Sequence, residues 1–362
     1  MSAPFLRRAA VMDAARSLAA FVLALAVGAV IIALMGVDPL RAYAALIDGA
    51  VGNRNSLGET LLRSIPLGLA GVGVSIAFRA GAFNVGAEGQ LFVGAMASAW
   101  VGLSLPGLPP VLLLAVMGLA AMLAGAAWAG IAGVLKAAVN ANEMINTIML
   151  NYVAVLLVSW LVHGPLKDPG SPLGQTARLP RAGYLPVILP GTRLHAGLIL
   201  LAVAAVVAAL ALARTAWGFR IRVVGTSTLV ARASGMRVNR VTVGALALSG
   251  MLAGLAGFCE AAGVQHRMIE SISPGYGYTA IVVALLGQTS PLGVLVAAVL
   301  FAALQIGAST MESAVHVPSS VITVIQYLVV LLLIGRGAVD LARSRLGRIG
   351  PRRAARAREP RP

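Results

Sequence analysis

The sequence predicts an all-α polytopic membrane protein, on the strength of its composition, its hydropathy and its glycine content. Hydrophobic residues make up 59% of the 362 residues and charged residues only 11%, less than half the charged share of a typical soluble domain. The mean hydropathy is +0.90. The 41 glycines favour close helix approach inside a membrane. This composition excludes a disordered chain and argues against a soluble enzyme.

Nine apolar runs come close to or reach the length that a spanning helix needs, roughly 17–25 residues. They cover 18–36, 62–79, 90–105, 110–135, 145–163, 196–214, 241–264, 292–312 and 319–335. A tenth segment, 276–288, is short and flanked by glycine, which is typical of interrupted helices at transport sites. The first run is longer than the core of a signal peptide, so we expect it to be retained. We therefore predict about ten transmembrane helices, some of them broken or short.

The distribution of arginine predicts the orientation and the domain boundaries. The N-terminus (1–17) and the tail (336–362), which holds nine arginines, should both be cytoplasmic by the positive-inside rule. Two ends on one side require an even number of spans across the transmembrane domain, 18–335. Within it we expect the Pro- and Gly-rich segment 164–195 to be an external loop and the Arg-rich segment 214–240 to be a cytoplasmic loop.

The basic residues indicate a lipid bilayer as partner and no nucleic acid, because they gather at the ends of apolar runs and in the tail. A short amphipathic helix is predicted at 226–234, closed by Gly235 as its cap. Two interpretations stay open for this loop: an ordinary basic connection, or a docking helix for a cytoplasmic partner.

Polar residues interrupt the apolar sequence most densely at 79–90, where Asn84, Glu88 and Gln90 occur among glycines. Polar groups inside a membrane are costly, so each is a functional candidate. This stretch could be a short cytoplasmic turn. Alternatively, it could be a backbone break whose polar groups face a transport pathway, since non-helical backbone is tolerated where it lines a cavity or is buried in protein.

A second polar pattern lies on the predicted helix that follows Lys136. Asn140, Glu143, Thr147 and Asn151 fall within roughly 80° of arc at 100° per residue. The stripe could line a pore, or it could hold helices together through hydrogen bonds. Asn146 lies off the stripe by roughly 120°.

The remaining polar residues give weaker signals. Glu260 lies within or near the outer end of the seventh apolar run, and the single cysteine, Cys259, is expected to be an inert buried thiol. The four histidines have no mutual metal-ligand spacing, so we interpret them as structural and expect no metal site and no cofactor. No P-loop, zinc-protease or nucleophile-elbow motif occurs.

Four stretches together resemble a known family: AGAFNVGAEGQ, NEMINTIMLNY, GPLKDPGSP and AIVVALLGQTSPLG, in this order. They are similar to the permease subunits of ABC importers in the branched-chain amino acid and simple-sugar superfamily. The first two stretches are most similar to its nucleoside branch. The resemblance covers about 60–340, most of the chain.

The resemblance implies a heteromeric importer in a bacterial inner membrane. A second homologous permease subunit would share the pathway, a cytoplasmic ATPase subunit would drive transport, and a substrate-binding protein would deliver the ligand. It also implies an inverted repeat of spans two to five and seven to ten. The chain itself would not be an enzyme, because ATP hydrolysis would belong to the separate subunit.

The resemblance further implies two groups of functional residues. We expect the translocation pathway, or the residues that brace it, to include Asn84, Glu88, Gln90, Glu143, Asn146 and Asn151. A coupling helix would fall on about 225–237, with ATPase coupling by Gly225, Ser227, Thr228, Ala231, Gly235 and Met236. The family usually has an Asn-Pro pair where this chain has Ser227 and Thr228.

Alternatives remain for the substrate and for the mechanism. Nucleosides are the substrate that the resemblance favours, and simple sugars or other small polar solutes are the alternative. A secondary transporter coupled to ions through Glu88, Glu143 or Glu260 is a less favoured class, because intramembrane carboxylates are few. A membrane enzyme is disfavoured, since no catalytic constellation is present.

Overall fold

The computed structural model describes residues 22–328 and residue 331. This part of the chain is all-helical, without a strand, which confirms the predicted all-α polytopic class. The predicted N-terminus (1–17) and basic tail (336–362) lie outside the described residues. The labelled helices are α2 (Pro39–Val51), α3 (Arg54–Arg79), α4 (Ala87–Ser104), α5 (Pro110–Val139), α6 (Glu143–His163), η1 (Arg181–Gly183), α7 (Gly197–Arg214), α8 (Ala216–Thr226), α9 (Thr228–Ala233), α10 (Val238–Glu260), η2 (Ala261–Gln265), α11 (Tyr276–Leu286) and α12 (Pro291–Val315).

Six helices of the described part are long and apolar enough to cross a membrane. They become seven if Val22–Leu34 and α2, which meet at a bend of 118°, count as one broken span. The ten predicted spans are therefore not reached by length and composition alone. The apolar helices α11 and Ser319–Leu328 are shorter. With 11 residues, α11 is about 16 Å long, roughly half the hydrocarbon thickness.

Helix boundaries differ most from expectation at α3, which was predicted to begin at residue 62 and begins at Arg54. The Asn53 side chain accepts a hydrogen bond from Ser56 N at 2.8 Å and so caps the helix N-terminus. Polar residues of the first two turns hid this extension from a hydropathy pattern. Segment 164–195 is irregular as predicted, apart from the single turn η1.

The chain forms two compact units, Met1–Ala45 with Met311–Pro362, and Leu46–Thr310. Within the described part of the first unit, helix Val22–Leu34 packs on helix Ser319–Leu328. Gly28 lies directly against the Ile325 side chain. The Tyr43 hydroxyl donates a hydrogen bond to Leu25 O at 2.6 Å, which fixes the bend between the two N-terminal helices.

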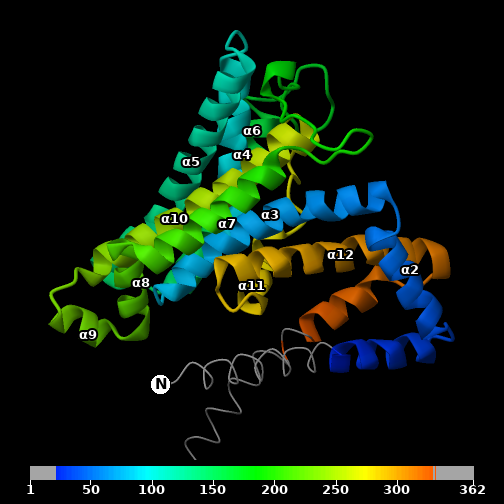
Figure 1. Ribbon diagram of the computed structural model, residues 1–362. Helices are drawn as coiled ribbons and strands as arrows, with labels where there is room; N and C mark the ends of the chain where they lie inside the picture. Colours follow the sequence, from blue (N-terminus) through cyan, green and yellow to red (C-terminus); the bar gives the residue numbers. More distant parts are fainter. Residues whose placement is uncertain (1–21, 329–330, 332–362) are drawn as a thin grey trace, which may run out of the picture. The chain divides into compact units, whose positions relative to one another are not determined.

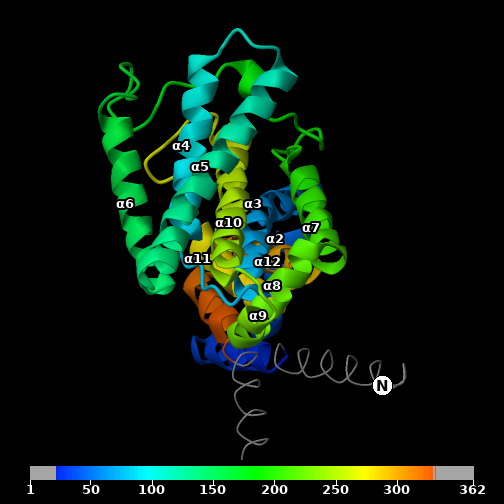
Figure 2. The ribbon, with the colours of Figure 1, turned by 90° about the vertical axis from the view of Figure 1, so that its left-hand side faces the viewer.

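The second unit is built around α10, which packs against α5, α3 and α4 (Figure 1). Helices α6 and α7 lie on opposite flanks of this group (Figure 2). The close approach depends on glycine. A side chain at Gly94 of α4 would collide with the Gly254 backbone of α10, and one at Gly125 of α5 would collide with Gly250 O. Small residues at these crossings bring the backbones into direct contact.

The two loops that the arginine distribution assigned to opposite sides lie at opposite ends of this unit. Helices α8 and α9 lie at one end, together with the connection between α3 and α4, and segment 164–195 lies at the other (Figure 2). The glycine-rich sequence at 79–90 thus lies at the same end as the predicted coupling segment.

Candidate functional site

The site is centred on the connection between α3 and α4, residues 80–86. Gly81 has φ +72, a conformation that favours glycine. Ala82 N donates to Ala77 O at 3.0 Å and closes the end of α3. The first N–H groups of α4, like those of any helix, have no helical acceptors. Side chains accept hydrogen bonds from Val85 N and Gly86 N of the connection and from Gly89 N of α4.

Asn84 is fully buried and makes four hydrogen bonds. Its Nδ2 donates to Gln90 Oε1 at 2.9 Å and to Ser249 Oγ of α10 at 2.8 Å. Its Oδ1 accepts from Gly86 N and from Gln90 Nε2, both at 2.9 Å. An amide offers two donors and one oxygen with two lone pairs, so Asn84 uses its full capacity. The Asn84 side chain thus holds the α3–α4 connection against α10, and none of its polar groups is free to bind a ligand.

Asn151 of α6 holds the same connection from the other side. Its Oδ1 accepts from Gly89 N at 2.9 Å, and its Nδ2 donates to Val85 O at 2.9 Å. Nδ2 also lies 3.3 Å from the Tyr278 hydroxyl of α11. One turn earlier, Thr147 Oγ1 accepts from Val85 N at 3.2 Å. The polar stripe on α6 therefore faces the connection between α3 and α4 and binds its backbone.

Glu88 links the first turns of α4 and α11. Its side chain is 5% exposed, and Oε2 accepts from Gly277 N at 2.6 Å. Gly277 lies so close to Ala87 and Glu88 that a side chain there would collide with the α4 backbone. Since the N-termini of helices are positive, the carboxylate is stabilised by both. Ser273 Oγ accepts from Gly275 N and Tyr276 N and caps α11.

Two more predicted site residues lie at the start of α6 and face different surroundings. Glu143 pairs with Lys136 at the end of α5, with Oε2 2.6 Å from Nζ. This pair closes the turn between the two helices. Asn146 is off the stripe, and its Nδ2 is buried with no hydrogen-bond partner in the described part of the chain.

A second group of charged residues lies near Glu260, which is 4% exposed at the end of α10. The guanidinium groups of Arg63 and Arg193 lie near enough to act on its charge. Arg193 forms a two-pronged pair with Glu59, at 2.9 and 2.6 Å. Arg63 lies over the Tyr276 ring, 5.7 Å from its centre. The sequence singled out only Glu260, because its partners come from segments distant in the chain.

His195 lies outside the spanning helices and is 1% exposed. Its Nδ1 accepts a hydrogen bond from Gly197 N at 3.1 Å, and its ring contacts Gly263. Burial lowers the pKa of His195 to about 4, assisted by the nearby His266. The imidazole is therefore neutral near pH 7 and anchors the end of segment 164–195, in line with the structural role predicted for it. The neighbouring Tyr184 stacks on His266 with ring centres 3.8 Å apart.

The predicted coupling segment contains a helix where one was expected. Ser227 Oγ accepts from Val230 N at 3.3 Å and begins α9, so Ser227 caps the helix that the family's Asn-Pro pair would begin. The helix ends as predicted at Gly235, which has φ +75. Met236 N donates to Ala231 O at 3.0 Å, and Gly235 N donates to Arg232 O at 3.0 Å. This pair of bonds is the Schellman motif.

Residues of the coupling segment divide into buried and exposed sets. Ala231 is fully buried, whereas Leu229 is 79% and Val230 53% exposed. Gly225 lies directly against Arg79 O, so that a side chain there would collide with the end of α3. The backbone of the coupling segment thus touches the connection that Asn84 and Asn151 hold. Leu229 and Val230 were not among the predicted residues, although an exposed apolar pair on a polar loop is the signal that would identify them.

Of the six predicted pathway residues, the structure therefore gathers three around the α3–α4 connection: Asn84, Gln90 and Asn151. Glu88 belongs to the first turn of α4, next to them. Glu143 and Asn146 lie apart, at the turn between α5 and α6. Ser249 was missed by sequence reasoning. A lone polar residue in the apolar run of α10 could have revealed it, since such residues seldom occur without a partner.

Comparisons with known proteins identify several relatives of this chain. A glucose ABC transporter permease protein from Haloferax volcanii is 42% identical over 86% of this chain and 84% of its own length. A guanosine ABC transporter permease protein from Bacillus subtilis is 35% identical over 92% and 96%. A nucleoside ABC transporter permease protein from Lactococcus lactis is 32% identical over 82% and 84%.

No solved structure matches the chain significantly. The family described as the permease component of branched-chain amino acid transport systems matches residues 56–334. This range contains the α3–α4 connection, the polar face of α6 and the coupling segment. The relatives of this chain are permeases of ABC transporters, which indicates a role in transport and not in catalysis. The chain belongs to this family of ABC transporter permeases.

Proposed function

We propose that the chain forms part of the translocation pathway of an ATP-driven importer of nucleosides. The buried amide network of Asn84, Gln90 and Asn151 is the observation that carries this proposal. Asn84 and Gln90 are paired with each other, and Asn151 binds the backbone of Val85 and Gly89 in the same stretch. We interpret them as a brace that keeps an irregular connection in one geometry beside the pathway, and Glu88 as part of the same brace.

Several features support import by an assembly of subunits. The exposed Leu229 and Val230 offer an apolar surface to an ATPase subunit, which would hydrolyse ATP outside this chain. A second permease subunit would complete the pathway, and a substrate-binding protein would deliver the ligand. We further propose ten spans in a bacterial inner membrane, with both termini cytoplasmic and an inverted repeat. The short helix α11 would be one of the ten.

Nucleosides are supported by two relatives whose names specify guanosine and nucleosides. A nucleoside is a neutral polar molecule. A pathway braced by satisfied amides and paired carboxylates presents few unpaired charges that such a solute would have to neutralise. Simple sugars are the second candidate, because the relative with 42% identity is named as a glucose permease.

The test is uptake into proteoliposomes that contain the complete importer with its ATPase and binding protein. Labelled guanosine, uridine and glucose would be compared at equal concentration, with and without ATP. We expect ATP-dependent nucleoside uptake that unlabelled glucose does not inhibit. Glucose uptake without nucleoside uptake would establish the second candidate. Uptake driven by an ion gradient in liposomes that hold this chain alone would refute the ATP-driven mechanism.

A further inference from the structure

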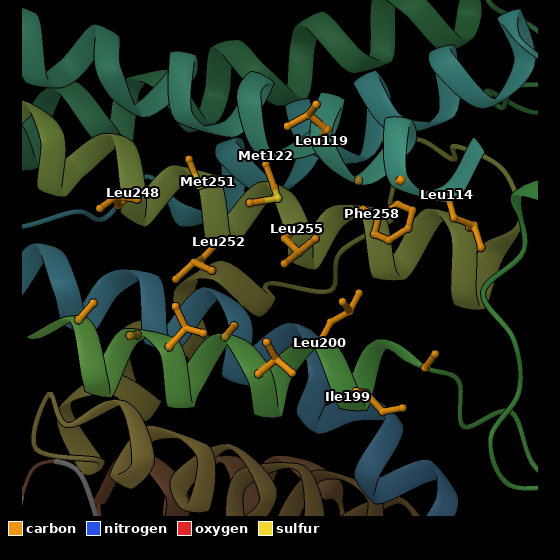
Figure 3. A pocket seen from close by; sticks show the side chains of 18 of the residues that line it. Leu114, Leu119, Met122, Ile199, Leu200, Leu248, Met251, Leu252, Leu255 and Phe258 are labelled. Carbon is orange, nitrogen blue, oxygen red and sulfur yellow. The ribbon is translucent and has the colours of Figure 1, made fainter. Parts of the chain in front are cut away.

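A long apolar groove separates α7 from α5 and α10. Its volume is about 750 Å³. Figure 3 shows Leu200 of α7 on one wall and Met122 of α5, Leu252 and Leu255 of α10 on the other. Every lining side chain is a hydrocarbon or a thioether apart from the Trp217 indole. Apart from this indole, no lining side chain offers a hydrated polar solute a hydrogen-bonding partner.

The groove extends along most of α7. Residues from Ala196 to Leu212 line it at helical spacing, a length of about 24 Å at 1.5 Å per residue. This length approaches the thickness of the hydrocarbon region, about 30 Å. An unbranched hydrocarbon chain lying along the helix would match the groove in both shape and polarity.

Arginines continue the groove beyond its apolar part. On α7, Ala211 lines the groove and Arg214 follows it by three residues. On α8, Trp217 lines the groove and Arg220 follows it by three residues. Residues three apart share a helix face, so both arginines continue the lining face at the end where α8 lies. Tryptophan is enriched at the membrane–water interface, which places this end at headgroup level.

The third wall repeats the pattern on α10. Leu248 lines the groove, Gly244 lies four residues before it against the Trp217 ring, and Arg240 lies four residues earlier still. Arg214, Arg220 and Arg240 are all exposed. Within residues 22–328, none of the three forms an ion pair or donates a side-chain hydrogen bond. By helical spacing, Arg214, Arg220 and Arg240 therefore follow the lining faces beyond one end of the apolar groove, and none has an ion-pair partner among the described residues.

We propose that this groove binds an anionic phospholipid, with an acyl chain along α7 and the phosphate at Arg214, Arg220 and Arg240. Basic pockets between membrane helices are suited to anionic headgroups, and each arginine near the headgroup strengthens binding by about fivefold. The lipid fills the space between α7 and the central helices. It thereby supports the helix that leads directly into α8 and the coupling segment.

The test uses the full chain in phosphatidylcholine nanodiscs that contain a small fraction of phosphatidylglycerol with a photoreactive acyl chain. Peptide mapping by mass spectrometry would locate the cross-links. We expect labelling on the groove-lining faces of α7 and α10. Unlabelled phosphatidylglycerol should compete, and unlabelled phosphatidylcholine should not. Arg214→Gln should lower the labelling by about fivefold, and the triple change with Arg220→Gln and Arg240→Gln should lower it further.

Matched controls separate the headgroup site from general surface charge. Arg54→Gln, Arg178→Gln and Arg181→Gln together remove the same net charge elsewhere in the unit and should leave labelling unchanged. Ala204→Trp fills the groove from α7 and should abolish labelling, whereas Ala202→Trp, at an exposed position that does not line the groove, should not.

Three results would overturn the proposal. Equal competition by phosphatidylcholine would show that the arginines select no headgroup. Labelling that persists at the same peptides in Ala204→Trp would show that the acyl chain lies outside the groove. Absence of labelling in the native chain would mean that protein fills the space, and cross-links from residues 1–21 to α7 would identify that occupant.

Discussion

At the scale of single residues, substitutions of Glu88 distinguish between two interpretations of residues 80–90, a structural brace and a simple turn. Its carboxylate accepts a short bond from Gly277 N across the unit. Glutamine keeps the accepting oxygen, while alanine leaves the buried N–H without a partner at a cost of about 1–3 kcal/mol. We expect Glu88→Ala to lower the thermal midpoint in detergent and to reduce uptake far more than Glu88→Gln does.

The matched comparison for this experiment uses Glu59→Gln and Glu59→Ala. Glu59 lies on α3 and forms a partly exposed ion pair with Arg193. Partly exposed pairs contribute about 0–1 kcal/mol, so these two variants should differ little. Near-native uptake and stability for both Glu88 variants would mean that residues 80–90 form only a turn.

His195 makes the stability of the unit depend on pH. Its pKa is about 4 in the folded chain, below its ordinary value of 6.5, because burial disfavours the imidazolium. Above pH 6.5 the ring is neutral in both states and adds no pH dependence. Between pH 6.5 and 4 the unfolded chain binds a proton that the folded chain does not. The folded state therefore loses up to about 3 kcal/mol as the pH falls.

The measurement is the thermal midpoint of the native chain and of His195→Gln at pH 7.5, 6 and 4.5. Other groups titrate in this range too, so the decisive quantity is the difference between the two proteins. We expect the native midpoint to fall more steeply below pH 6.5. Parallel curves would show that His195 is protonated without cost, and hence is not buried in the folded protein.

At the scale of elements, local signals predicted more than hydropathy did. The cap at Gly235 and the helix before it were predicted from a single glycine after an amphipathic stretch, and the Schellman bonds confirm both. By contrast, the early start of α3 depends on the Asn53 cap, and the bend of 118° before α2 depends on tertiary contacts such as Tyr43 with Leu25. Neither interaction changes the average hydropathy of a window.

In the candidate site, too, the sequence predicted local features but not the contacts between distant segments. Periodicity predicted a polar stripe of Asn140, Glu143, Thr147 and Asn151, and the last three are buried on α6. Asn140 was placed wrongly, because it is the left-handed C-cap of α5 and lies before α6 begins. Periodicity could not predict which backbone groups the polar face of α6 would bind. Asn84 bonds to Ser249 across 165 positions of sequence, and the Glu88 partner is 189 positions away. Only the folded chain brings such pairs together.

The exposed apolar pair on α9 predicts where an ATPase subunit binds. Leu229 is 79% exposed, while Ala231 is fully buried and holds the helix in place. We expect Leu229→Asp to weaken binding of the ATPase subunit and abolish ATP-driven uptake, with the fold intact, because the side chain has few contacts within the chain. Co-purification and uptake would be measured together.

Gly235→Pro and Ala231→Asp serve as comparisons, because both act on the helix itself. Proline cannot adopt the φ of +75 that Gly235 has, and an aspartate at 231 would bury an unpaired charge. Both should uncouple transport through loss of α9, visible as faster proteolysis of the loop. Normal co-purification of Leu229→Asp with the ATPase would place the docking surface on another segment.

At the scale of the whole molecule, the proposed orientation rests on two independent features. Arginine is concentrated at the termini and in 214–240, which the positive-inside rule assigns to the cytoplasm. Segment 164–195 lies at the opposite end of its unit from α9 (Figure 2). The first feature predicts an even number of spans. The second feature requires only that the chain cross the membrane between segment 164–195 and α9.

A single-cysteine experiment tests this topology directly. The only natural cysteine, Cys259, is fully buried and should not react with an impermeant maleimide. We expect Ala177→Cys, exposed in segment 164–195, to be labelled on intact cells, and Ala233→Cys, exposed on α9, to be labelled only after permeabilisation. Ser2→Cys and Arg358→Cys, near the two ends of the chain, should behave like Ala233→Cys. Labelling of one terminus but not the other on intact cells would require an odd number of spans. It would then exclude α11 or one of the other short helices as a complete crossing.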